Sequence, residues 1–158
     1  MRSIFLQAAA VALTACGGHG HEHAGEGIEI SNAIIHPPLP GQSTGVAFMR
    51  LDNHGDADRL LAVSSPASGR VELHTISNED EIMRMRRVDG IDVPHGEPVE
   101  LKSGGDHIMM FDANMVLGDE VVLTLDFEKA EDLTVVAPVI ARGTKPKGDD
   151  AQGSHSGH

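Results

Sequence analysis

Two segments near the C-terminal end of the chain alternate apolar and polar residues with a period of two. Residues 121–128 place four large apolar side chains on one side of the chain, and residues 133–139 repeat the pattern. Alternation of this kind gives an extended strand one buried face and one face that contacts water. The pattern therefore predicts β-strands, and with them a sheet that must cover its apolar face.

Shorter segments of similar character occur through the rest of the chain. Glycine- and proline-containing turn signals such as "SSPASG", "PHGEP" and "KSGGD" separate them. No long amphipathic helix is predicted. Many short strands at this spacing favour an all-β fold of one domain, an antiparallel sandwich or barrel. The further predicted strands are 28–35, 45–52, 59–64, 70–76, 81–88, 98–102 and 107–111.

The N-terminus has the pattern of an export signal. Arg2 precedes a short apolar run, too short for a stable membrane anchor, that ends in "LTAC" at Cys16. This ending resembles a bacterial lipobox, in which the cysteine is lipidated and begins the mature chain. The alternative is an ordinary secretory signal with an unrelated cysteine. We expect a signal peptide over 1–15 and a lipid-anchored protein on the periplasmic side of the cell envelope.

Two polar tails flank the predicted domain, which spans 28–140. The tether 16–27 and the tail 141–158 are rich in glycine and histidine and lack apolar periodicity, so both are expected to be disordered. Histidine-rich tracts can bind Cu(II), and the tails are either secondary metal sites or merely solvated. The histidines concerned are His19, His21, His23, His155 and His158.

Composition excludes several functions. The formal net charge is −12 and there is no Trp or Tyr, so neither a basic stripe nor an aromatic platform for nucleic acid exists. No hydrolase or metalloprotease motif and no cysteine nucleophile are present, which argues against an enzyme. The single cysteine also rules out an intramolecular disulfide.

Histidine and methionine are unusually frequent, and four of them form a candidate metal site. His107 and Met109 are two apart in a predicted strand, so they share a face that Ile108 and Met110 do not. His74 and Met85 lie in two other predicted strands, and Met83 is a possible further thioether. A lone methionine or histidine in a strand is usually packing or a satisfied polar group. Met49, Met110 and Met115 are interpreted in that way.

Thioethers are soft neutral ligands that favour Cu(I), and imidazole also binds copper. Zinc would favour Cys, His and carboxylate ligands. A blue-copper electron carrier needs a cysteine ligand, and Cys16 lies outside the predicted domain. These ligands therefore indicate a copper carrier. Without a thiolate, its site should hold the ion less tightly than a cysteine-containing site would.

The spacing of the four residues is specific. Ten residues separate His74 from Met85, twenty-one separate Met85 from His107, and one separates His107 from Met109. This pattern resembles the signature of the periplasmic copper chaperone family, the PCuAC-like proteins. The surrounding stretches "DRLLAVSSPASGRVELHT" and "LGDEVVLTLDFEKAEDLTVVAPV" are similar to that family as well, over residues 30–140.

The resemblance implies a cupredoxin-like Greek-key sandwich that binds Cu(I) near its surface. It also implies delivery of copper to the CuA-bearing subunit of cytochrome c oxidase, together with a thioredoxin-like assembly protein. Two alternatives stay open: an envelope metal buffer that uses the histidine tails, and a structural lipoprotein that binds no metal.

Overall fold

The computed structural model describes residues 27–79 and 82–144, which contain ten strands and no helix. No segment of that part of the chain is therefore a helix long and apolar enough to cross a membrane. The predicted signal peptide, Cys16 and all five tail histidines lie outside the described residues. The strands are β1 (Ile28–His36), β2 (Gly45–Asn53), β3 (Asp58–Ser64), β4 (Arg70–Glu79), β5 (Ile82–Arg87), β6 (Ile91–Val93), β7 (Val99–Leu101), β8 (His107–Phe111), β9 (Glu120–Phe127) and β10 (Leu133–Pro138).

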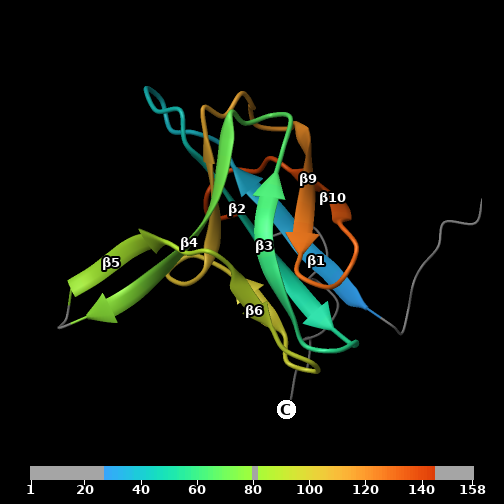
Figure 1. Ribbon diagram of the computed structural model, residues 1–158. Helices are drawn as coiled ribbons and strands as arrows, with labels where there is room; N and C mark the ends of the chain where they lie inside the picture. Colours follow the sequence, from blue (N-terminus) through green and yellow to red (C-terminus); the bar gives the residue numbers. More distant parts are fainter. Residues whose placement is uncertain (1–26, 80–81, 145–158) are drawn as a thin grey trace, which may run out of the picture.

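The strands form two sheets that pack face to face (Figure 1). The first sheet has the order β1-β2-β8-β4-β5, with β7 also paired to β2, and the second has the order β10-β9-β3-β6. Neighbouring strands in both sheets are antiparallel. The chain crosses between the sheets repeatedly, as in Greek-key sandwiches. The predicted all-β antiparallel sandwich is confirmed.

The observed strands agree with the predicted segments to within a few residues at each end, apart from one strand that the sequence did not predict. Strand β6 has only three residues, which is too short for an alternating pattern to stand out. Strand β6 forms by pairing with β3, with Ile91 opposite Leu60 and Val93 opposite Asp58. Tertiary pairing thus creates a strand that local sequence does not specify.

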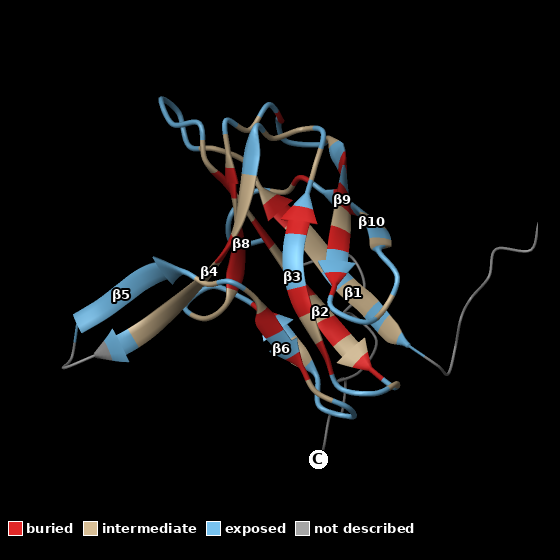
Figure 2. Cartoon of the chain, in the orientation of Figure 1, coloured by how far each residue is buried: buried red, intermediate tan, exposed pale blue. Residues whose placement is uncertain are grey.

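The core lies between the two sheets, where the buried residues gather (Figure 2). Strand β9 shows the predicted alternation, with the residues from Val121 to Phe127 buried at every second position. From the first sheet, Ile108 and Met110 are fully buried. Burial of one such side chain stabilises the fold by about 1.5–3 kcal/mol relative to its exposed state. The opposite face of β8 is consequently free to carry polar and thioether groups.

A buried carboxylate fastens the second sheet to the loop that follows β9. Asp58 accepts hydrogen bonds from the backbone N–H groups of Arg59 at 2.7 Å, Lys129 at 3.0 Å and Ala130 at 2.8 Å. Burial by itself would raise the pKa of Asp58, but these donors outweigh it and hold that pKa below its usual value. The carboxylate is therefore ionised in the native state at neutral pH.

The hairpin formed by β4 and β5 projects from the body of the sandwich (Figure 1). Strand β4 pairs with β8 only from Arg70 to His74, and from His74 to Glu79 it pairs with β5. All six residues of β5 are exposed. His74 therefore lies at the point where the hairpin leaves the sheet, between β8 and β5.

Candidate metal centre

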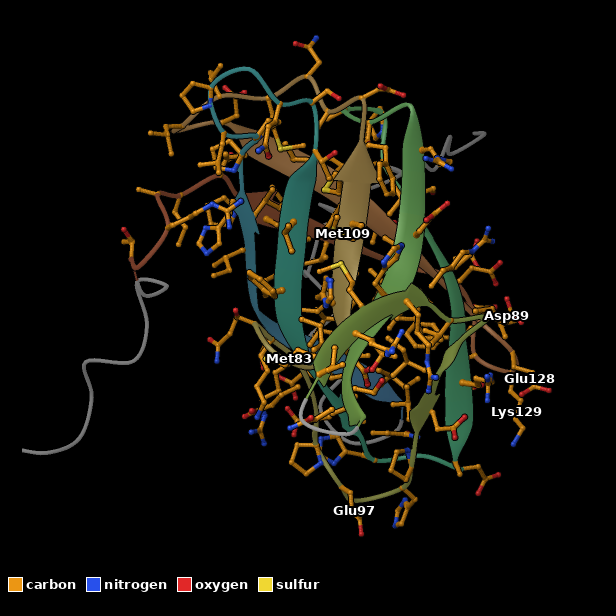
Figure 3. The ribbon with its side chains drawn as sticks, turned by 90° about the vertical axis from the view of Figure 1, so that its left-hand side faces the viewer. Met83, Asp89, Glu97, Met109, Glu128 and Lys129 are labelled. Carbon is orange, nitrogen blue, oxygen red and sulfur yellow. The ribbon has the colours of Figure 1, made fainter. Side chains whose placement is uncertain are left out.

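Strand register brings the four predicted ligands to the outer face of the first sheet. His74 on β4 is opposite His107 on β8, and Met85 on β5 is opposite Ile76, which follows His74 by two residues. Residues opposite one another in antiparallel strands project to the same face. Met109 shares this face because it is two residues from His107. Figure 3 looks onto the face and labels Met109 on β8.

A glycine turn positions His107 at the start of β8. Gly104 has a φ of 84°, a conformation that residues with a Cβ rarely adopt. The carbonyl of Gly105, next in this turn, lies 2.8 Å from Nδ1 of His107. Because a carbonyl can only accept, Nδ1 carries the proton and Nε2 presents a lone pair. His107 is only 3% exposed.

His74 has the opposite arrangement of its two ring nitrogens. Its Nε2 lies 2.9 Å from a carboxylate oxygen of Glu72, so Nε2 carries the proton and Nδ1 presents the lone pair. The rings of His74 and His107 are 6.0 Å apart between centroids. Nδ1 of His74 and Nε2 of His107 are buried without a hydrogen-bond partner among the described residues.

The two orphaned nitrogens fit a bound cation. A buried polar atom without a partner destabilises a fold by about 1–3 kcal/mol, so such atoms are rare unless they have a role. Here they belong to adjacent imidazoles, and each is the unprotonated nitrogen of its ring. The two rings are close enough, with centroids 6.0 Å apart, for both nitrogens to be candidate ligands of one ion.

Two thioethers accompany the histidines. Met85, Met109 and His107 line one open pocket of about 400 Å³. His74 does not line this pocket, but its ring centroid is 6.0 Å from that of His107, which does. Met109 is half-buried on β8, whereas Met85 is 53% exposed on the projecting hairpin. The pocket therefore has one firmly held thioether and one that faces solvent.

Glu72 is a site residue that the sequence reasoning missed. Its pKa is held below the usual range, first by the hydrogen bond from His74, against the effect of burial, and then by the nearby charges of Arg70 and Arg87. The signal was available in "ELH", because residues two apart in a strand share a face. No pattern in the sequence, by contrast, indicates that the Gly105 carbonyl accepts a hydrogen bond from His107.

The donor set is soft and neutral. No group of three or more His, Cys, Asp or Glu side chains suited to a metal ion occurs within residues 27–79 and 82–144. The candidate ligands are instead two imidazoles and two thioethers, which together favour Cu(I) over zinc. The fold and site thus define a β-sandwich with an open site for a soft monovalent cation.

The other predicted residues fall into separate groups. Met83 shares the face of Met85 but is 66% exposed, lies further along the hairpin and does not line the pocket (Figure 3). Three methionines that were interpreted as packing residues are indeed buried in the core: Met49, Met110 and Met115. A metal-binding role for Met83 stays a prediction.

Comparison with known proteins identifies the family. The LpqE-like family model matches residues 28–139, and this chain belongs to that family. The copper-bound PCuAC domain from PmoF2 is 30% identical over 77% of this chain and 99% of its own length, with a TM-score of 0.63. The predicted membership among PCuAC-like proteins is confirmed.

Further solved structures share the fold. The apo PCuAC domain from PmoF1 is 22% identical over 77% of this chain and 99% of its own, with a TM-score of 0.63. Apo-DR1885 from Deinococcus radiodurans, solved in solution, is 22% identical over 89% of this chain and 97% of its own, with a TM-score of 0.57. No curated protein gives a significant match.

Proposed function

We propose that this protein is a chaperone that binds one Cu(I) ion through His74, Met85, His107 and Met109 and passes it to an acceptor. The observation that carries the proposal is the pair of buried, unprotonated imidazole nitrogens, Nδ1 of His74 and Nε2 of His107, on adjacent rings beside two thioethers. The copper-bound state of the similar PmoF2 domain supports it.

Release by ligand exchange follows from the donor set. All four ligands are neutral, so the ion and its ligands together carry only the single charge of Cu(I), and an acceptor with thiolate ligands would bind the ion more tightly. Met85 faces solvent on the hairpin and can be displaced first, while His107 is buried. Each step forms one bond from an acceptor ligand to copper and breaks one bond to this chain, without a change in oxidation state.

The destination of the copper extends the proposal. The family resemblance favours delivery to the CuA-bearing subunit of cytochrome c oxidase, with a thioredoxin-like assembly protein as a second partner. The lipobox-like sequence at Cys16, and a family description that names a lipoprotein, support an anchored protein outside the cytoplasm. In this role the protein transfers an ion and catalyses no reaction.

Cu(I) titration of the mature chain under reducing conditions, in competition with a chromogenic chelator, tests the proposal. The wild-type protein should bind one tight equivalent, and His74→Ala and Met109→Ala should each lose it. His95→Ala is the matched control, because His95 is exposed and bonds to the Gly55 carbonyl, outside the site.

A second variant separates the alternatives. Replacement of the five tail histidines by alanine should leave the tight equivalent in place. Loss of binding in this variant alone would favour the metal buffer, and absence of Cu(I) binding in every form would favour a structural lipoprotein. The residues replaced are His19, His21, His23, His155 and His158.

A further inference from the structure

Glu72 lies against the face of the first sheet that carries the metal site. It precedes His74 by two residues and is directly opposite Met109 in the pairing of β4 with β8. One carboxylate oxygen is 2.9 Å from Nε2 of His74, and the Glu72 side chain is only 10% exposed. An ionised carboxylate has no proton to donate, so this contact requires the imidazole to donate through Nε2.

Two arginines hold the carboxylate from its other side. Arg70 is 3.0 Å and Arg87 is 3.8 Å from the second oxygen of Glu72. Arg70 also lies 4.3 Å over the ring of Phe111, whose ring centroid is 6.2 Å from that of His74. The contacts to Glu72 come from β4 and β5, and Phe111 on β8 packs against Arg70, so the orientation of Glu72 does not depend on one strand alone.

We propose that Glu72 is a positioning residue that makes His74 bind metal through Nδ1, whereas His107 binds through Nε2. The carboxylate occupies Nε2 of His74, and the Gly105 carbonyl occupies Nδ1 of His107. Each ring then has one nitrogen left, and these are the two buried atoms without a partner. The identity of the ion as Cu(I) rests on the proposed function, but the choice of nitrogen does not.

The same contacts keep Glu72 from binding the ion itself. One of its oxygens accepts from His74 and the other faces Arg70 and Arg87. The negative charge is therefore compensated within the protein, and the donor set presented to the ion stays neutral. Residues that orient a metal-binding histidine in this way typically change metal affinity by about 10- to 100-fold when they are removed.

The test uses Glu72→Ala and Glu72→Gln in the full mature chain. Glu100→Gln is the matched control, because Glu100 contacts Lys102 and Arg50 on the same sheet and does not line the pocket. Long-range proton–nitrogen NMR of the metal-free protein reports which imidazole nitrogen carries the proton. Competition with a chelator reports the affinity for Cu(I).

In the wild-type protein His74 should be protonated at Nε2 and His107 at Nδ1. In Glu72→Ala, the His74 pattern, by which we mean protonation at Nε2 alone, should be lost, while His107 should stay protonated at Nδ1. The affinity for Cu(I) should fall by about 10- to 100-fold. Glu72→Gln retains an acceptor oxygen, so it should keep His74 protonated at Nε2 and should lose less Cu(I) affinity than Glu72→Ala does. If Glu72→Ala does not fold, Glu72→Gln still provides the test.

Several results would overturn the positioning role. One is wild-type affinity with an unchanged His74 pattern in Glu72→Ala. A second is a loss of affinity with that pattern intact, because Glu72 would then act through its charge alone. A wild-type protein that binds no Cu(I) would refute the proposed function, whereas the proton positions in the metal-free protein would still decide the role of Glu72.

Discussion

Adjacent methionines on β8 allow a sharp test of the site, because Met109 and Met110 point to opposite faces of one strand. Met110 is fully buried between the sheets, whereas Met109 is half-buried in the pocket. Met110→Ala should lower the free energy of unfolding by about 2–5 kcal/mol through lost burial and a residual cavity. Met109→Ala should lower it by about 1 kcal/mol.

Copper binding should show the reverse order. Met109→Leu removes the sulfur but keeps the volume, so we expect Cu(I) affinity to fall by at least about tenfold, or 1.4 kcal/mol. Met110→Leu is the matched control, and it should keep both copper binding and most of the stability, since volume-conserving changes remove less than about 1.5 kcal/mol.

Urea unfolding of the metal-free proteins and chelator competition for Cu(I) measure the two effects separately. With a urea dependence of about 2 kcal/mol per molar, Met110→Ala should lower the unfolding midpoint by about 1–2.5 M. The assignment of faces would be refuted if Met110→Leu lost Cu(I) while Met109→Leu kept wild-type affinity.

Three further predictions concern other residues. Met85→Leu should weaken Cu(I) binding more than Met83→Leu in chelator competition, because Met83 does not line the pocket. Stability should fall as the pH drops below about 4, because the native pKa of Asp58 lies below its unfolded value of about 3.9; Asp58→Asn should flatten this decline in urea titrations. Asn53→Ala should lose about 3 kcal/mol in urea unfolding, because it removes three hydrogen bonds, to Asp56, Val93 and Gly55.

Much of the fold could be predicted from local sequence. Alternation with a period of two gives each strand its buried face, and in β8 it separates His107 and Met109 from Ile108 and Met110. The order of the strands could not be predicted in this way, because antiparallel pairing depends on contacts between distant residues. Strand β6, which has three residues, is the clearest example.

For the candidate site, the sequence predicts which residue types come together but not which of their atoms face the ion. The spacing indicated which side chains come together, and register then placed His74 directly opposite His107. Neither pattern showed that Glu72 and the Gly105 carbonyl hold opposite nitrogens of the two rings. Such contacts depend on side-chain orientation and turn geometry, which local sequence specifies only weakly.

Residue patterning alone did not predict how exposed Met85 is, although the family resemblance implied a site near the surface. An apolar residue in an alternating strand is usually assigned to a core, but β5 lies on a hairpin that leaves the sandwich and has no second sheet above it (Figure 2). In the proposed function, this open side of the candidate site is where an acceptor would exchange ligands with the ion.

X-ray absorption at the copper edge tests the central claim most directly, on the protein loaded with one equivalent of Cu(I). We predict a first coordination shell that contains sulfur and imidazole nitrogen together, with the sulfur contribution reduced in Met109→Leu. A shell of nitrogen and oxygen alone, unchanged by Met109→Leu, would contradict a site built from His74, Met85, His107 and Met109.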